Sequence, residues 1–344
     1  MLTQTELNNL SPKADRALGS VVGALIGDAA GGIFEFMGRP PTLKEAQAAL
    51  DLPGGGVFDL APGQFTDDGE MTMALLGAIA KGKGAYKQEL AAQAYCEWEQ
   101  SNPFDIGLAT RAALRVPKAA MNNPKSLAKL VYSQALEHNS ASKANGCMMR
   151  ATPLGIAATG CNIEETIEMV ASDVVLTHPN KDCVDSTVAY VLALRHLILQ
   201  DGDGEGAIEV ANTYLSDNNR SVVGWLDQAI EGNIDPVTKH IGFVKHGFTL
   251  AFHFLAYQFS YEEAIIQTLL KSGDTDTNAC IVGGMIGASL CINEINRNSI
   301  KQLLNESSQS FIDRPQQYKV GCISKNLLKS LGLIVYPDTC LNLD

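Results

Sequence analysis

The sequence predicts an all-α protein, and three observations support this class. Capping-box pairs recur, with Ser260 followed by Glu263 and Asn162 followed by Glu165. Apolar residues repeat at helical spacing in most segments, as they do between residues 163 and 174. Alternation of apolar and polar residues, which is typical of strands, is scarce. We therefore expect roughly a dozen or more helices, with no domain linker and no internal repeat.

Composition sets the broad class of protein. The 344 residues are 46% hydrophobic and 19% charged, which favours a large core. The net charge of −12 argues against a nucleic-acid backbone or an anionic membrane as a partner. The eight cysteines are scattered without a C-x-x-C pair, as expected for reduced thiols in a cytoplasmic protein. The polar start is not typical of a signal peptide, and no apolar run is long enough to predict a membrane span.

The chain is expected to begin with a polar arm over residues 1–13, followed by a domain over residues 14–344. The arm is either a disordered tail or a surface for a target protein. From Ala14 a helix carries glycines at four-residue spacing, at positions 19, 23, 27 and 31. Because glycine destabilises helices, this face predicts very close packing of a second helix.

The same helix leads to Asp28 and then to Glu35, which lies between two phenylalanines. Such a carboxyl group is partly desolvated, and desolvation raises its pKa. The alternative is a surface glutamate at a helix end. Residues 38–65 are rich in glycine and proline and are expected to form a long loop. The loop leads directly to Thr66-Asp67-Asp68, which precedes a helix-like run over residues 71–80.

Further helices are expected over residues 90–98, 163–174, 184–199, 221–231, 244–258 and 322–332. Residues 201–206 are interpreted as a solvated turn, because they lack the lysine and the preceding strand of a phosphate loop. The segment before Arg150, residues 143–149, could present backbone N–H groups to a phosphate, whereas Arg150 itself could pair with an acid. His178 follows Thr177 at a helix end, where it is either a packed or capping side chain or a catalytic one.

A second acidic cluster follows the helix expected from Ser260 to Lys271. Its residues 274–277, Asp-Thr-Asp-Thr, are predicted to form a loop before a buried helix over residues 278–292. One interpretation is that Asp276 or Thr277 caps that helix. The other is a hard-cation site, in which this cluster and Thr66-Asp67-Asp68 face each other across one cleft.

Five motifs appear in a fixed order: Gly27-Asp28-Ala-Ala-Gly31 with Glu35, Phe65-Thr66-Asp67-Asp68 with Met71, Asn145-Gly146 with Met149-Arg150, Thr177-His178, and Gly273-Asp-Thr-Asp-Thr-Asn278. In this order they resemble the ADP-ribosylglycohydrolase family, of the dinitrogenase reductase-activating type, from about residue 16 to residue 335. The resemblance implies a single compact, orthogonal multi-helix fold around a binuclear metal cleft. It also implies two Mg²⁺ ions, or Mn²⁺, and hydrolysis of the bond between ADP-ribose and a protein side chain.

The resemblance further implies roles for individual residues. The implied metal ligands are Thr66, Asp67 and Asp68 on one side, and Asp274, Asp276 and Thr277 on the other. Glu35 matches an acid that contacts the metals and helps to open the substrate site. Asn145, Gly146 and Cys147 match the loop that holds the ADP part, and His178 matches a residue near the ribose. Phe243 stands where relatives often have tyrosine, so it keeps the stacking face and loses the hydroxyl group.

Cleavage of this glycosidic bond passes through an oxocarbenium-like state. We expect a water held at the metals to be the nucleophile, with Glu35 or Asp67 as its base. ADP-ribosyl-arginine is the expected substrate, because the motifs look closest to the arginine-directed bacterial branch. A serine or other O-linked ADP-ribose is the alternative, and the reaction could serve as immunity against an ADP-ribosylating toxin. A dimetal nucleotide phosphohydrolase and a non-catalytic ADP-ribose-binding module are alternatives of different classes.

Overall fold

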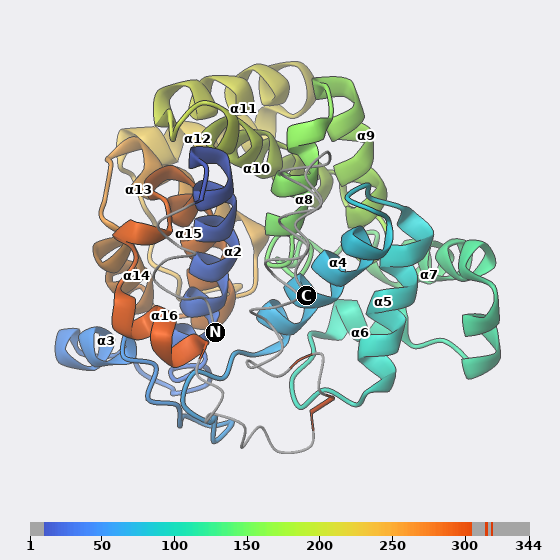
Figure 1. The fold of residues 1–344 in the computed structure, drawn as a ribbon, viewed down its shortest axis with the longest axis horizontal. Coiled ribbons are helices and arrows are strands. Elements are labelled where there is room, and N and C mark those ends of the chain that lie inside the picture. The colour runs from blue at the N-terminus through green and yellow to red at the C-terminus, as the bar shows by residue number, and fades with distance from the viewer. Residues whose placement is uncertain (1–9, 305–313, 316–317, 319–344) are drawn as a thin grey trace.

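Two long helices pack side by side at the centre of the molecule: α2 (Pro12–Gly31) and α15 (Thr275–Leu290) (Figure 1). The structure is a computed structural model that describes residues 10–304, 314, 315 and 318. Over these residues it contains fifteen α-helices and no strand, which confirms the all-α prediction. None of these helices combines the length and apolar character needed to cross a membrane.

The other helices surround this pair. Those of the first half of the chain are α3 (Leu43–Ala49), α4 (Asp67–Lys81), α5 (Gln88–Gln100), α6 (Leu108–Leu114), α7 (Pro124–Asn139) and α8 (Thr152–Ala157). Those of the second half are α9 (Ile163–Val174), α10 (Lys181–Leu199), α11 (Gly204–Asn218), α12 (Arg220–Glu231), α13 (Val244–Ala256), α14 (Tyr261–Leu270) and α16 (Arg297–Leu303). Short 3₁₀ helices lie at Lys118–Asn122, Ala158–Gly160 and Ile292–Glu294.

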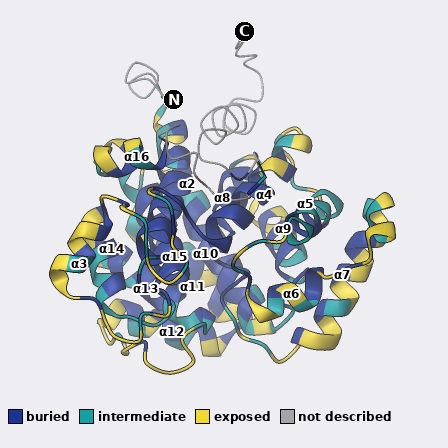
Figure 2. Cartoon of the chain, turned by 90° about the horizontal axis from the view of Figure 1, so that it is seen from below, coloured by how far each residue is buried: buried dark blue, intermediate teal, exposed yellow. Residues whose placement is uncertain are grey.

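The glycine face of α2 lies directly against α15, as the four-residue spacing predicts. A β-carbon on Gly27 would overlap the carbonyl group of Ala279, and one on Gly23 would overlap that of Gly283. Gly283 in turn has no room for a β-carbon because the backbone of Gly23 is too close. Both helices are almost entirely buried (Figure 2), so this close contact forms the middle of the core.

Most predicted helices are present, and their caps explain where they begin. The Asn162–Glu165 capping box of α9 is complete, and the Ser260 side chain accepts a hydrogen bond from the backbone N–H of Glu263. The central helix α2 begins at Pro12, because Ser11 caps it, so the helix includes the end of the expected arm. The rest of that arm, residues 1–9, lies outside the described residues, as does the helix expected over 322–332.

Three local predictions are wrong. Residues 201–206 are not a turn throughout, because α11 begins at Gly204 with Asp203 as its N-cap. Residues 38–65 are not a continuous loop, because α3 forms there with a complete capping box between Thr42 and Glu45. The second acidic cluster is not a loop either: α15 begins at Thr275, so Asp276 and Thr277 lie in its first turn. The Thr275 hydroxyl donates to the backbone oxygen of Gly31 at 2.9 Å, a tertiary contact that fixes the start of this helix.

Candidate functional site: a buried carboxylate cluster

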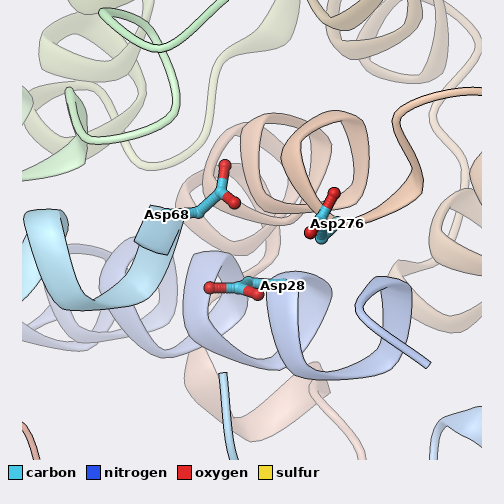
Figure 3. A group of neighbouring side chains, drawn as sticks. All are labelled: Asp28, Asp68 and Asp276. Carbon is cyan, nitrogen blue, oxygen red and sulfur yellow. The ribbon is translucent and has the colours of Figure 1, made fainter. Parts of the chain in front are cut away.

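The two acidic motifs meet where three helix ends converge (Figure 3). Asp28 comes from the last turn of α2, Asp68 from the first turn of α4, and Asp276 from the first turn of α15. Carboxylate oxygens of these three residues lie within 4.8 Å of one another, and all three side chains are buried. The structure therefore brings Asp68 and Asp276 together from opposite sides, although they are far apart in the sequence.

Helices α4 and α15, which carry the two acidic motifs, are capped by acids from outside those motifs. The N–H of Gly69 donates to Asp28 at 2.6 Å, and the N–H of Thr275 donates to Glu35 at 3.2 Å. Neither α4 nor α15 has a side-chain hydrogen bond from its own N-cap residue. The N-cap residue of α15 is thus Asp274, and neither Asp276 nor Thr277, although Asp276 Oδ1 accepts a hydrogen bond from the first-turn N–H of Thr277 at 2.9 Å.

Hydrogen-bond donors are too few for these acids. The Thr66 hydroxyl oxygen lies 2.8 Å from Asp28 Oδ1, 3.0 Å from Asp68 Oδ2 and 3.4 Å from Asp276 Oδ2. Asp28 Oδ1 also accepts the backbone N–H of Thr66 at 2.9 Å, but a hydroxyl group has one proton, so it cannot satisfy both Asp68 Oδ2 and Asp276 Oδ2. The other oxygen of Asp68, Oδ1, is buried without any hydrogen-bond partner among the described residues. Such an oxygen-only, donor-poor cluster fits a hard divalent cation.

A second group of acids adjoins the first. Carboxylate oxygens of Glu35, Asp274 and Asp276 also lie within 4.8 Å of one another. The two groups have one residue in common, Asp276, as expected if two cations lie side by side. Glu35 is buried, which agrees with the desolvated carboxyl group predicted from its two phenylalanine neighbours.

Burial makes these acids hard to ionise. Desolvation raises the pKa of Asp28 and of Glu35 to about 7, and nearby acids contribute in the same direction. Desolvation and the neighbouring carboxylates also raise the pKa values of Asp67, Asp68 and Asp276 well above the ordinary value. In the absence of a cation, the folded protein therefore holds protons that its unfolded chain would release.

The remaining members of the first motif lie at the edge of the site. Asp67 Oδ2 accepts a hydrogen bond from the N–H of Gly107 at 3.3 Å, and Asp67 faces Asp105. Burial raises the pKa of Asp105 to about 6. The sequence prediction missed Asp105 because the segment around it carries no recognisable motif. It also left Asp28 out of the ligand set, although Asp28 stands inside the first quoted motif.

The loop around Asn145 contacts the cluster directly. Its side-chain amide donates to Asp274 Oδ2 at 2.8 Å, and its backbone N–H donates to the carbonyl oxygen of Gly242 at 3.0 Å. Phe243 follows Gly242, and its half-buried ring packs edge-on against Trp225 with ring centroids 5.2 Å apart. The structure thus places Asn145 and Phe243 on one side of the acids, where a pocket is lined by residues 141, 143–144 and 240–243.

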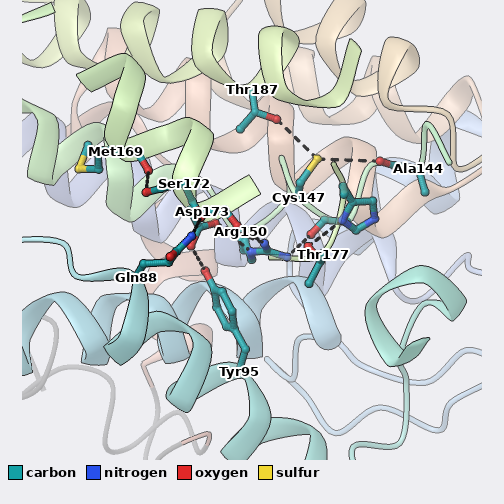
Figure 4. A network of polar contacts seen from close by, with 12 residues as sticks. Gln88, Tyr95, Ala144, Cys147, Arg150, Met169, Ser172, Asp173, Thr177 and Thr187 are labelled. Carbon is teal, nitrogen blue, oxygen red and sulfur yellow. Dashed lines mark hydrogen bonds and ion pairs between the residues drawn. The ribbon is translucent and has the colours of Figure 1, made fainter. Parts of the chain in front are cut away.

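Arg150 has a structural role beneath this loop (Figure 4). It is fully buried, pairs with Asp173 at 3.3 Å and stacks over the ring of Tyr95 with its guanidinium carbon 4.5 Å from the ring centroid. It also donates to the carbonyl oxygen of Gly146 at 3.0 Å. Of the two interpretations of this segment, pairing of Arg150 with an acid is therefore confirmed.

Cys147 of this loop and His178, whose ring borders Gly146, are both buried. Desolvation, with the nearby Arg150 charge, lowers the pKa of His178 to about 3, so the imidazole is neutral at physiological pH. Its Nδ1 lies 2.8 Å from the Thr177 hydroxyl oxygen. The Cys147 sulfur accepts a hydrogen bond from the Thr187 hydroxyl at 3.6 Å (Figure 4), so the thiol faces α10.

Comparisons with known proteins agree with this architecture. A family model described as ADP-ribosylglycohydrolase matches residues 9–325. An Acanthamoeba polyphaga mimivirus protein, named as an ADP-ribosyl glycohydrolase, is 32% identical over 89% of this chain and 95% of its own. The ADP-ribosyl-[dinitrogen reductase] glycohydrolase of Rhodospirillum rubrum is 26% identical over 82% of this chain and 87% of its own.

Two further matches are a partial sequence match and a structural match. The ADP-ribosylarginine hydrolase Tri1 of Pseudomonas putida is 29% identical, over 48% of this chain and 53% of its own. A solved structure titled "ADP-ribosylglycohydrolase-related protein complex" superposes with a TM-score of 0.71 at 21% identity, over 95% of this chain and 99% of that chain, and shows the same fold. Together with the family match over nearly the whole chain, the helical fold and the buried acids lead to one conclusion: this protein belongs to the ADP-ribosylglycohydrolase family.

Proposed function

We propose that the protein is a metal-dependent hydrolase that removes ADP-ribose from arginine side chains of modified proteins in the cytoplasm. One observation carries the proposal: two groups of carboxylates, all buried except the half-buried Asp274, share Asp276, and one Thr66 hydroxyl lies against three of their oxygens. The name of the Pseudomonas putida relative, an ADP-ribosylarginine hydrolase, supports arginine as the modified residue. The proposed cofactors are two Mg²⁺ ions, or Mn²⁺, since carboxylate and hydroxyl oxygens suit both.

Two sets of side chains would hold the cations. Asp28, Asp68, Asp276 and the Thr66 hydroxyl would hold one, and Glu35, Asp274 and Asp276 the other. When bound, divalent cations of this kind orient the hydroxyl groups of a sugar and lower the pKa of a water. Thr277 lies in the same helix turn as Asp276, and its backbone N–H donates to Asp276 Oδ1 at 2.9 Å, which orients this shared carboxylate.

The protein's own acids would then handle the proton. Glu35 is the first candidate to accept a proton from the attacking water and to give one to the leaving nitrogen, and in that role it would leave the second cation to Asp274 and Asp276. Burial raises the pKa of Glu35 to about 7 in the cation-free site, and a bound cation would lower it. Asp67 is the second candidate for this base, because it adjoins the cluster and faces Asp105. The Asn145 amide holds Asp274 in place, and the pocket beside Phe243 would take the ADP part. Gly146 and Cys147 belong to the same loop, which Arg150 and Thr187 hold in place, and His178 would lie beside it.

Matched synthetic peptides test the proposal. The protein, loaded with Mg²⁺ or Mn²⁺, is offered the same peptide with ADP-ribose on arginine or on serine, and released ADP-ribose is measured. We expect faster release from arginine. A clear preference for serine would show that serine is the modified residue, and the proposed reaction class would still stand. Release of AMP from ADP-ribose itself would favour a dimetal phosphohydrolase. Tight ADP-ribose binding without turnover of any substrate would favour a binding module.

The biological role is a separate part of the proposal. Removal of ADP-ribose would reverse mono-ADP-ribosylation of a cellular protein, or protect the cell against an ADP-ribosylating toxin. Expression of active and inactive enzyme in cells exposed to such a toxin separates these roles. Protection by the active enzyme alone would support immunity.

A further inference from the structure

Three phenylalanines from separate loops form a chain of edge-to-face contacts, which we call the aromatic rim: Phe36, Phe58 and Phe104. The ring centroids of Phe36 and Phe58 are 5.9 Å apart, and those of Phe58 and Phe104 are 5.6 Å apart. Phe36 is 64% exposed and Phe104 is 40% exposed, so the rim presents aromatic surface to solvent instead of filling the core. An exposed, contiguous aromatic surface of this kind is typical of an interaction site.

Each ring of the rim is adjacent in sequence to a carboxylate. Glu35 precedes Phe36, Asp59 follows Phe58, and Asp105 follows Phe104. Glu35 lies in the second acid group with Asp274 and Asp276, and Asp105 lies beside Asp67 at the edge of the cluster, whereas Asp59 is exposed. The rim therefore borders the candidate site directly.

The backbone at Phe36 is strained. Its φ angle is +56°, in the left-handed region that bulky residues rarely adopt. Backbone strain of this kind persists where the surrounding structure holds it, often at ligand-binding positions. Here the strain accompanies an exposed ring next to Glu35. Phe36 also lines a groove of about 640 Å³, together with Arg39, Ile241 and Gly273, the residue before Asp274.

The groove beside Phe36 adjoins the pocket proposed for the ADP part, because Ile241 lines both. Asn145 and Gly242 approach the cluster at Asp274, next to the pocket beside Phe243. Phe36 and Phe104, in contrast, are the sequence neighbours of Glu35 and Asp105. In the proposed function, the ADP part occupies the pocket beside Phe243. The polypeptide that carries the modified residue can then contact the aromatic rim where it extends away from the acid cluster.

The charges around the rim favour a cationic occupant. The cluster and its edge contain seven carboxyl groups, of which two divalent cations would balance four negative charges: Asp28, Glu35, Asp67, Asp68, Asp105, Asp274 and Asp276. Two cations line the groove beside Phe36: Arg39, which pairs with Glu45 at 2.6 Å, and Lys271. The charge of Arg111 acts on Asp105. Arginine is the side chain that both stacks on aromatic rings and pairs with carboxylates.

We infer that the aromatic rim binds a basic segment of the substrate polypeptide, with an unmodified arginine next to the ADP-ribosylated residue stacking on Phe36 or Phe104. This inference rests on the proposed function and adds a preference for the sequence around the modification. It predicts that the enzyme distinguishes modified proteins by their neighbouring residues as well as by the modified side chain.

The test combines enzyme variants with peptide variants. Two synthetic peptides carry one ADP-ribosyl-arginine, flanked by two arginines or by two glutamines, and free ADP-ribosyl-arginine serves as the third substrate. The enzymes are the native protein, Phe36→Leu and Phe104→Leu, which keep apolar bulk and lose the ring, and Phe104→Tyr, which keeps the ring. Tyr132→Leu, at an exposed aromatic residue of α7, is the matched control.

We expect the native enzyme to prefer the arginine-flanked peptide roughly tenfold in kcat/KM, with most of the difference in KM. The two leucine variants should lose that preference and cleave free ADP-ribosyl-arginine normally, while Phe104→Tyr and Tyr132→Leu should retain it. No flank preference in the native enzyme, or one that the leucine variants keep, would overturn the inference. An equal loss on all three substrates would show a structural role instead. If the native enzyme cleaves none of them, the proposed function itself fails, and the inference with it.

Discussion

Asp28 caps helix α4 from a different helix, through a 2.6 Å hydrogen bond that it accepts from the backbone N–H of Gly69. The Thr66 N–H donates to the same carboxylate, at 2.9 Å to Oδ1. A helix N-terminus stabilises a negative charge, and this contact places the buried Asp28 beside Asp68. This hydrogen bond between two helices explains how the fold keeps several acids close together.

The first prediction concerns metal dependence. A chelator should abolish hydrolysis, and Mg²⁺ or Mn²⁺ should restore it, because the oxygen donors of the cluster need a cation. Either metal should also raise the melting temperature, since a ligand that binds only the folded state stabilises it. Full activity in excess chelator, with no metal found by elemental analysis, would contradict the two-metal proposal.

Neutral replacements within the cluster should separate stability from activity. Asp68→Asn and Asp276→Asn should each lower turnover by at least about a thousandfold, because the acids act as a unit. The same changes should stabilise the metal-free protein by more than about 1 kcal/mol, because folding at neutral pH must protonate these acids and a neutral amide avoids that cost. Denaturant unfolding in chelator measures this effect. Asp217→Asn, at an exposed position of α11, is the control and should change neither quantity.

The stability of the metal-free protein should fall as the pH rises from about 6.5 to 8. Asp28 and Glu35 have folded-state pKa values of about 7, raised from 3.8 and 4.5, so their stabilising contribution is present at low pH and is lost as pH rises through 7. His178, with a pKa lowered to about 3, contributes in the opposite direction, but its contribution is complete above the ordinary histidine value of 6.5. Melting temperatures in chelator provide the measurement. A rise over this range would contradict the assignment, and added metal should reduce the fall.

Substitution of glycines should have opposite effects at two positions. Gly27→Ala places a β-carbon against the backbone of Ala279 and should destabilise the protein by about 2 kcal/mol or more. Gly77→Ala, on an exposed position of α4 with open space around it, should stabilise it by about 0.5–1 kcal/mol. Chemical denaturation of both variants gives the two values. Equal effects would show that the contact between α2 and α15 does not require glycine.

A buried ion pair should stabilise the helix that carries the first acidic motif. Arg314 Nε donates to Glu70 Oε1 at 2.8 Å, and the Trp98 ring N–H donates to Glu70 Oε2 at 2.7 Å. Arg314→Met leaves the charge of Glu70 buried and unpaired, so we expect a loss of about 3–5 kcal/mol. The double variant Glu70→Gln, Arg314→Met should recover much of that loss. Unfolding free energies of the three variants form the test, and a double variant no more stable than Arg314→Met would refute the pairing argument.

The sequence alone determined the local features of this fold. Capping pairs such as Asn162 with Glu165 predicted where helices begin, because they act within a few residues. The glycine spacing of α2 predicted a close helix contact, because it depends only on helical periodicity. Both acidic motifs were identified from adjacent carboxylates, which repel one another unless something compensates. These inferences required no knowledge of distant contacts.

Only the tertiary structure decided which acids meet. Asp28 joins Asp68 and Asp276 because α2 packs against α15 and ends beneath α4, and no local pattern encodes that distance. Asp105 comes near Asp67 through a loop that carries no motif. The choice of Asp173 as the partner of Arg150 likewise depends on how α9 packs. Local propensities act over a few residues, whereas a site of this kind forms where buried surfaces from distant segments exclude water together, and that arrangement is set by packing of the whole chain.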